Sequence, residues 1–364
     1  MNRRQWIVGA GGIAVLGGGA TLVTLYEMGS SSGYAADMAR LRTPLADPAL
    51  ASDLIRYATL APNGHNTQPW RFRIDRQRID ILPDLSRATP VVDPDNHHVF
   101  VSLGAAAANL ALASAARGQP GFARFDPVDG AVRFEFASGQ AAGSALFDAI
   151  PARQSTRADF DGRAVGTADL AMLANAAAVP GVDLVLLTDR IRIDHLRDLV
   201  VAGNSAQRGD PAFVRELKSW LRFNPRQALA TGDGLYSATS GSPGLPDWLG
   251  PEAFDWLSTA SAQNRGYARQ IRSSAGIAVF VGAAADPANW VAVGQSCQRF
   301  ALQATALGLK TAFINQPVEV ASLRPELAAL VGLPGRRPDI VMRFGYGPTM
   351  PWSPRRPVAA VMAA

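Results

Sequence analysis

The stretch APNGHNTQPW, residues 61–70, suits neither a helix nor a strand. It places two prolines, a glycine, two asparagines, a histidine, a glutamine and a tryptophan within ten positions. Proline lacks an amide hydrogen, and glycine and asparagine accept turn conformations that other residues avoid. The stretch therefore predicts an irregular, amide-rich loop. It ends a helix expected over residues 47–60 and precedes strand-like alternation over residues 71–84.

The composition is that of a globular protein. The chain has 364 residues, of which 48% are hydrophobic and 18% are charged, so it can bury a sizeable core in one or two domains. The net charge of +5 comes from dispersed arginines, without a basic run interleaved with aromatics. This distribution argues against nucleic-acid binding. The single cysteine, Cys297, excludes an intramolecular disulfide, and its apolar surroundings favour a small buried side chain over a nucleophile.

The N-terminal residues form a segment of their own, which we place at 1–36. Arg3 and Arg4 precede about twenty uncharged residues, the layout of a twin-arginine-type export signal or of a membrane anchor. We therefore expect an exported protein, periplasmic or membrane-anchored with its domain on the outer side. Cleavage near Gly33 and Ala35 and retention of the segment both stay open. The glycines of IVGAGGIAV do not fit a dinucleotide fingerprint, because only six residues precede them.

The rest of the chain alternates predicted helices and strands in two rounds. After a polar tether over residues 30–44, the first round spans residues 45–140 and the second spans residues 146–364. Residues 101–118 align without gaps on residues 291–308, which indicates either an internal duplication or two unrelated alanine-rich core helices. The Gly/Pro/Ser-rich residues 224–250 predict a long loop, a candidate lid.

The stretch IPARQSTRADF, residues 150–160, offers an anion receptor. Arg153, Ser155 and Arg157 alternate, so an extended backbone would place all three side chains on one face. Two guanidinium groups flanking a hydroxyl match the oxygens of a phosphate dianion, although a solvated edge strand would show the same pattern.

Other catalytic constellations find little support. We see no Ser/His/Asp set and no carboxylate pair in the sequence. His97 and His98 lie near Asp93 and Asp95, but the spacing is irregular and predicts no metal site. His65 is a candidate proton donor, with a structural hydrogen bond as the favoured alternative. We therefore expect no catalytic side chain and no metal.

Three segments together resemble the flavin-dependent nitroreductase family: RQSTRADF, APNGHNTQPW and the C-terminal LQATALGLKTAFINQPVEV…FGYGPTMPWSPRRPV. The stretch DPDNHHVFVSLGAAAANL and the signal-like N-terminus resemble its Acg-type branch. The resemblance spans about residues 45–360. It implies an α+β fold, a nitroreductase-like α/β/α sandwich, with FMN bound at an interface between two subunits.

The resemblance also implies which residues bind FMN. Basic residues and a serine would hold the phosphate, the amide-rich loop would face the flavin ring, and NQPVEV would pack against it. The residues so assigned are Arg153, Ser155, Arg157, Arg355 and Arg356 for the phosphate, with Asn63, Gly64, Asn66, Gln68, Pro317, Val318 and Glu319 around the ring.

The order of these motifs implies a fused dimer. The family's usual order has the phosphate motif before the amide-rich loop, whereas here the loop comes first and lies in the other half. Two degenerate copies would then form an intramolecular pseudo-dimer, monomeric and with one FMN. The implied function is two-electron transfer from reduced FMN to a nitroaromatic, quinone or other small acceptor. The alternative is a catalytically silent protein that sequesters or carries FMN under the 224–250 lid, with Trp248 as a stacking residue. A membrane would be contacted only through the N-terminal segment.

Overall fold

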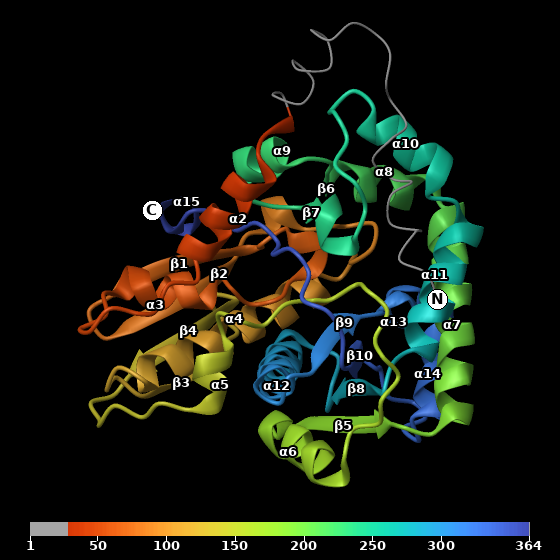
Figure 1. Cartoon of the computed structure of the whole chain (residues 1–364). Coiled ribbons are helices and arrows are strands. Elements are labelled where there is room, and N and C mark those ends of the chain that lie inside the picture. The colour runs from red at the N-terminus through yellow and green to blue at the C-terminus, as the bar shows by residue number, and fades with distance from the viewer. Residues whose placement is uncertain (1–27, 364) are drawn as a thin grey trace, which may run out of the picture.

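The computed structural model describes residues 28–363, so most of the predicted export segment lies outside the described residues (Figure 1). The expected tether over residues 30–44 is wrong, because it contains helix α2 (Ser31–Arg40). Ser30 caps this helix by accepting a hydrogen bond from the backbone N–H of Gly33. Tyr34 and Met38 are buried in a cluster with Ala228 and Tyr236, which fixes α2 on the body of the protein.

The first half is built on a four-stranded antiparallel sheet in the order β1-β2-β4-β3. The strands are β1 (Trp70–Asp75), β2 (Arg78–Pro83), β3 (Gly121–Asp126) and β4 (Ala131–Phe136). The same part of the fold contains helices α3 (Ala51–Ala58), α4 (His97–Ala115) and α5 (Ala145–Ala149). The fully buried side chains of Phe72, Ile79 and Phe134 belong to the core that the sheet shares with α3 and α4, whereas Ile74 and Phe122 are exposed.

The second half is a three-layer sandwich. Its antiparallel sheet has the order β5-β8-β10-β9, formed by β5 (Val182–Leu187), β8 (Gly276–Gly282), β9 (Lys310–Phe313) and β10 (Ile340–Gly345). Every residue of β8 and β10 is buried, because helices cover both faces. Helices α6 (Thr167–Ala177) and α12 (Pro287–Ala306) lie on one face, and α7 (Arg190–Gly209), α11 (Ala260–Arg272) and α14 (Arg324–Leu330) on the other (Figure 1). The predicted α+β class is confirmed.

Helices α4 and α12, which contain the two aligned segments, pack against each other at the centre of the molecule. A Cβ added to Gly104 would lie 2.0 Å from the carbonyl oxygen of Val291, and a Cβ added to Gly294 would lie 2.0 Å from that of Val101. Both contacts join aligned positions reciprocally, as a two-fold axis between equivalent subunits would require. Within residues 28–363, α4 is the one helix long and apolar enough to cross a membrane, but most of it is buried in this core.

Residues 210–258 form a cover that contains the predicted lid. The 224–250 stretch is more ordered than expected, because it holds α9 (Pro225–Thr231), β7 (Leu235–Tyr236) and η3 (Ser237–Ser240). Asn224 caps α9 and donates to the carbonyl oxygen of Leu245 over 3.0 Å. The cover is completed by α8 (Pro211–Ser219), β6 (Leu221–Arg222), which pairs with β7, and α10 (Gly250–Leu257).

Short elements complete the chain. They are η1 (Gly64–Asn66), η2 (Leu85–Arg87), α13 (Gln316–Glu319), η4 (Ala321–Leu323) and α15 (Val358–Val361). The C-terminal segment crosses back to the first half, where Met362 bridges Phe72 and the N–H of Ala363 donates to the carbonyl of Phe72 over 2.8 Å. The two halves therefore interlock as well as pack.

Candidate functional site

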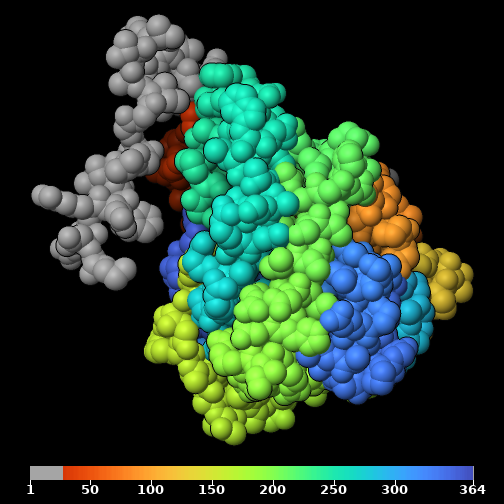
Figure 2. Space-filling model, turned by 90° about the vertical axis from the view of Figure 1, so that its right-hand side faces the viewer, coloured from red at the N-terminus to blue at the C-terminus, as the bar shows by residue number. Residues whose placement is uncertain are grey.

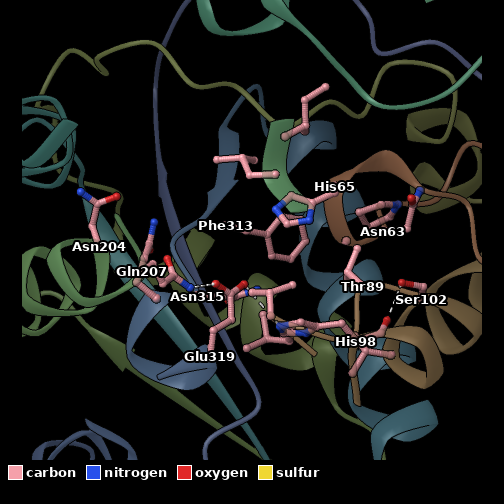
Figure 3. Close-up of a pocket in the computed structure, with 18 of the residues that line it drawn as sticks. Asn63, His65, Thr89, His98, Ser102, Asn204, Gln207, Phe313, Asn315 and Glu319 are labelled. Carbon is pink, nitrogen blue, oxygen red and sulfur yellow. Dashed lines mark hydrogen bonds and ion pairs between the residues drawn. The ribbon is translucent and has the colours of Figure 1, made fainter. Parts of the chain in front are cut away.

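A cavity of about 220 Å³ lies between the two halves. The first half lines it with residues 62–65 and with the start of α4, and the second half lines it with α7, α11 and α13. Figure 3 shows His65, Phe313, His98 and Glu319 around this space. We call it the central cavity.

The 61–70 loop is irregular, as predicted, and the structure shows why. His65, Asn66 and Gln68 have φ values of 45°, 55° and 54°, a left-handed conformation that is uncommon for residues other than glycine. The Oδ1 atom of Asn63 accepts from the backbone N–H of Gln68 over 2.8 Å and so closes the turn. Side-chain amides thus replace the hydrogen bonds that a helix or strand would supply.

The predicted loop residues divide into two groups. Asn63 and Gly64 line the central cavity. Asn66 and Gln68 are buried and turned into the protein, where Asn66 donates to the carbonyl of Gly234 over 3.0 Å and Gln68 donates to that of Gly232 over 2.8 Å. The last two residues therefore tie the loop to the cover.

Arg153 and Arg355 lie close to each other at the start of this loop, and both guanidinium groups are buried. Arg153 is 5% exposed and donates from Nη2 to the carbonyl of Leu60 over 3.1 Å, but its buried Nε and Nη1 atoms have no hydrogen-bond partner. Arg355 is 7% exposed and donates to the carbonyls of Thr59 and Ala61 and to Oδ1 of Asn66. Burial, and then the charge of Arg355, lowers the pKa of Arg153 to about 9.

A third cation, Arg42, reaches the same place from the segment after α2. Burial, followed by the charges of Arg355 and Arg153, lowers its pKa to about 9. Its guanidinium stacks 4.2 Å from the ring centre of Trp352. Among the described residues, no carboxylate lies within ion-pair distance of Arg42, Arg153 or Arg355. Sequence reasoning missed Arg42 because it lay in a stretch expected to be a tether.

Ser155 and Arg157 do not share this position. Residues 153–157 are loop rather than strand, with a single bridge between Ser155 and Thr311, so the expected common face of an extended strand is not formed. Arg157 lines the central cavity, and its guanidinium donates a long hydrogen bond of 3.4 Å to Oγ1 of Thr239. Arg356 bonds to the carbonyls of Gln68 and Ala360. Only Arg355 of the C-terminal pair therefore lies beside Arg153.

The NQPVEV segment forms α13. Its Pro317 and Val318 are buried in the helix, whereas Glu319 lines the central cavity. One carboxylate oxygen of Glu319 accepts from Nε2 of Gln207 over 2.6 Å, and the other lies 3.4 Å from Nε2 of His98. Burial raises the pKa of Glu319, but the hydrogen bond and charge of His98 outweigh it, so the net pKa is below its usual value.

His98 is the partner that sequence reasoning did not assign. Burial lowers its pKa, but the hydrogen bond to Glu319 and the charges of Asp93 and Glu319 outweigh burial and raise it. His65, on the opposite wall, has its pKa lowered by burial, and its buried Nδ1 has no partner. The cavity thus holds one histidine whose pKa is raised by its acidic neighbours and one whose pKa is lowered by burial.

The ligand atoms of Asp93, His97 and His98 lie within 4.8 Å of one another, but each already has a protein partner. Asp93 accepts from the backbone N–H of His98 over 3.0 Å and so caps α4, and His97 bonds to Oδ1 of Asp339 over 2.9 Å. Cys297, at the back of the central cavity, is buried, which raises its pKa to about 12 and keeps the thiol protonated. Asp93, His97 and Cys297 therefore have structural partners or surroundings, whereas His98 faces the cavity.

No protein-family model matches the chain. Two curated proteins of Mycobacterium tuberculosis are similar to the chain. "Putative NAD(P)H nitroreductase Rv3131" is 27% identical over 341 residues, which cover 89% of this chain and 94% of that protein. The chain is similar to nitroreductases over most of its length. "Putative NAD(P)H nitroreductase acg" is 26% identical over 347 residues and covers 87% of this nitroreductase-like chain and 97% of its own.

Solved nitroreductases superpose only in part. A nitroreductase with bound FMN from Desulfitobacterium hafniense shares 18% identity, covers 59% of this chain and 94% of its own, and has a TM-score of 0.36. The FMN-dependent nitroreductase NfnB of Mycobacterium smegmatis, in complex with NADPH, shares 14% identity and has a TM-score of 0.38. The match covers 56% of this chain and 87% of NfnB. Scores this low do not establish a common fold for the nitroreductase-like chain.

Proposed function

We propose that the chain is an FMN-dependent oxidoreductase of the nitroreductase family, in its Acg-type branch. It transfers two electrons from NAD(P)H to a nitroaromatic, a quinone or another small acceptor. One observation carries the proposal: Arg153 holds two buried guanidinium nitrogens without partners, beside Arg355 and at the foot of the amide-rich loop. Buried cations are normally paired, and a phosphate dianion supplies the missing acceptors.

The residues present fit FMN in two places. Arg153 and Arg355 would hold the phosphate, and Ser155 follows Arg153 closely in the chain. Arg157, Asn63, Gly64 and Glu319 line the central cavity, where the flavin ring would lie. Bound FMN supplies the hydride chemistry, and the cation of Arg157 favours the negative charge that develops on a reduced ring.

His98 and Glu319 provide a proton on the cavity wall. The pKa of His98 is raised, which favours its protonated form, and the carboxylate of Glu319 lies 3.4 Å from its Nε2 atom. An acceptor that gains a hydride must also gain a proton, and a group with a pKa near the working pH delivers it well. Phe313, together with Val101 and Ala105 of α4, lines the same cavity and limits water around the pair.

The two halves act as the two subunits of a dimer would. The first half lends the amide-rich loop and the second half lends Arg153 and Arg157. The reciprocal Gly104 and Gly294 contacts support a two-fold origin. We therefore propose a monomeric pseudo-dimer with halves at 45–140 and 146–364. It binds one FMN, and residues 224–250 of its cover act as the lid.

We also propose that residues 1–36 direct export or membrane attachment, so that the domain is periplasmic or held on the outer side of the membrane. Cleavage near Gly33 or Ala35 would cut helix α2, because both residues lie within it. This favours retention of the segment. Fractionation of cells that express the full chain tests this, with an Arg3→Lys, Arg4→Lys variant as the comparison. Equal distribution of the two proteins in the cytoplasm would refute it.

A second function is supported by the cover. Hydrogen bonds from Asn66 and Gln68 tie it to the amide-rich loop, which suits a protein that sequesters or carries FMN without turnover. The absorption spectrum of the purified protein, followed by NAD(P)H oxidation with a nitro compound or quinone, separates the two functions. Bound FMN with turnover supports the enzyme, bound FMN without turnover supports the carrier, and failure to take up FMN contradicts both.

A further inference from the structure

A second cavity, of about 510 Å³, lies beneath the cover. Apolar side chains from β6, the 241–250 loop and α10 form most of its wall, among them Leu221, Phe223, Leu245, Phe254 and Leu257. It is larger than the central cavity and falls in the usual size range of small-molecule pockets. We call it the cover chamber.

The cover chamber adjoins the central cavity. The two spaces share part of their wall. The side chains that line both are Arg157, Leu217, Leu235, Gln263 and Tyr267. Three of the polar residues of the chamber, Arg157, Gln263 and Tyr267, lie on this shared wall. The guanidinium of Arg157 has no ion pair among the described residues, and burial raises the pKa of Tyr267, which keeps its hydroxyl protonated as a donor.

The other end of the chamber reaches an apolar part of the surface. Leu257 lines the chamber and is also 75% exposed, and its neighbour Trp256 is 70% exposed. Helices α10 and α11 lie along one face of the molecule (Figure 2). Exposed large apolar groups beside an apolar cavity are unusual on a globular protein and mark places where apolar ligands bind or enter.

We propose that the cover chamber binds the single long apolar chain of an amphipathic acceptor. The electron-accepting head lies at Arg157 and Tyr267, and the chain runs beneath α10 toward Leu257. The role of the head as acceptor rests on the proposed function, but binding of the chain does not. Two observations support this direction: Arg157 and Tyr267 lie on the wall shared with the central cavity, and Leu257 lines the chamber where it reaches the surface.

The test compares two benzoquinones that differ only in chain length, with a decyl or a methyl substituent. Binding to the full-length protein as purified is measured by quenching of tryptophan fluorescence, at one fixed detergent concentration. We expect the decyl compound to bind at least about 10-fold more tightly, because each buried methylene adds to the affinity. Equal affinities would overturn the proposal.

Two matched variants locate the effect. Ala253 lines the chamber and is small, so Ala253→Phe fills the space and should abolish the decyl preference while leaving the methyl compound unaffected. Glu252→Phe puts the same bulk on the exposed side of α10 and should keep the preference. An unchanged preference in Ala253→Phe, folded by circular dichroism, would contradict the placement.

A surface variant keeps the test valid if Ala253→Phe does not fold. Leu257→Ser alters an exposed residue at the mouth of the chamber and should weaken decyl binding about 3-fold, with the methyl compound unchanged. Absence of any change there would also count against the proposal. NAD(P)H oxidation with the methyl compound reports separately on the proposed function, so failure of one is distinguishable from failure of the other.

Discussion

Arg153 combines burial with missing partners, so its replacement should have opposite effects on cofactor binding and on stability. Arg153→Met removes a cation that has one hydrogen bond in the described structure. FMN affinity should fall about 10- to 100-fold, since hydrogen bonds to charged groups are worth about 1.5–3 kcal/mol each. The flavin-free protein should gain stability, because a desolvated charge is lost. Flavin fluorescence titration and thermal unfolding measure the two effects.

Arg356→Met is the matched control for Arg153. Its guanidinium bonds to the carbonyls of Gln68 and Ala360, away from the Arg153 nitrogens. We expect FMN affinity within about 3-fold of the wild type, a change of well under 1.4 kcal/mol. If Arg356→Met released FMN and Arg153→Met retained it, our assignment of the phosphate site would be wrong.

The His98–Glu319 pair predicts a pH dependence of stability. The folded pKa of His98 is raised, so its contribution is fully present below the unfolded pKa of about 6.5 and is lost as pH rises through the folded pKa. Glu319 acts at the acid end: its lowered pKa gives a contribution that is lost as pH falls through the folded value. Melting temperature against pH in the wild type and in His98→Gln measures both.

In His98→Gln, the loss of stability above pH 6.5 should disappear. His65 and His97 titrate in the opposite sense, because burial lowers their pKa values, and they remain in both proteins as an internal control. The charges of Asp93 and Arg337 also act on His98, and both residues are present in the wild type and in the variant. Identical pH profiles for the two proteins would show that the pair does not form.

At the residue scale, sequence singled out Asn63, Gly64, Arg157 and Glu319, which line one cavity, and Arg153 and Arg355, which are buried beside each other; their binding of FMN stays a prediction. Local pattern sufficed there because each lies in a distinctive motif. Arg42 and His98 were not predicted. Each reaches the site through tertiary packing, one from a stretch without a motif and the other from a histidine pair that was considered only as a metal ligand.

Helices α4 and α12 depend on two glycines at their crossing. Gly104→Ala would put a Cβ 2.0 Å from the carbonyl oxygen of Val291, so the helices must separate. We expect destabilisation of about 1–3 kcal/mol or more, the range for overpacked cores. Gly294→Ala should cost a similar amount because its contact is reciprocal. Denaturant unfolding measures the change.

Gly143→Ala is the control for the helix crossing, since nothing lies within 4 Å of its added Cβ. Its stability should stay within about 0.5 kcal/mol of the wild type, as is usual for surface substitutions. If Gly104→Ala and Gly143→Ala behaved alike, the close approach of α4 and α12 would not exist in solution.

At the element scale, periodicity found most core helices and strands, because burial of one face imposes a repeat. It was wrong for residues 30–44 and incomplete for residues 224–250. Helix α2 has a weak apolar stripe and is held by Tyr34, which donates to the carbonyl of Trp352, over three hundred positions away, across 2.6 Å. Helix α9 is hidden in a Gly/Pro-rich run and begins at Asn224, whose cap is a local signal that the composition obscured.

The whole molecule should bind one flavin and remain a monomer. Each half supplies only part of the site, so a second complete site is not expected within the chain. Light scattering after size-exclusion chromatography gives the mass, and the ratio of flavin to protein absorbance gives the stoichiometry. A dimer with two flavins, one at an interface between chains, would contradict the pseudo-dimer.

The return of the C-terminal segment to the first half sets an order of events during synthesis. The carbonyl of Pro354 and the N–H of Arg356 bond to Asn66 and Gln68, each 288 positions earlier in the chain. A ribosome must therefore make nearly three hundred residues after the amide-rich loop before that loop can take its final shape. Until then the loop lacks the two hydrogen bonds that Pro354 and Arg356 supply. Under the proposed function, flavin capture should therefore follow translation and report that the fold has closed.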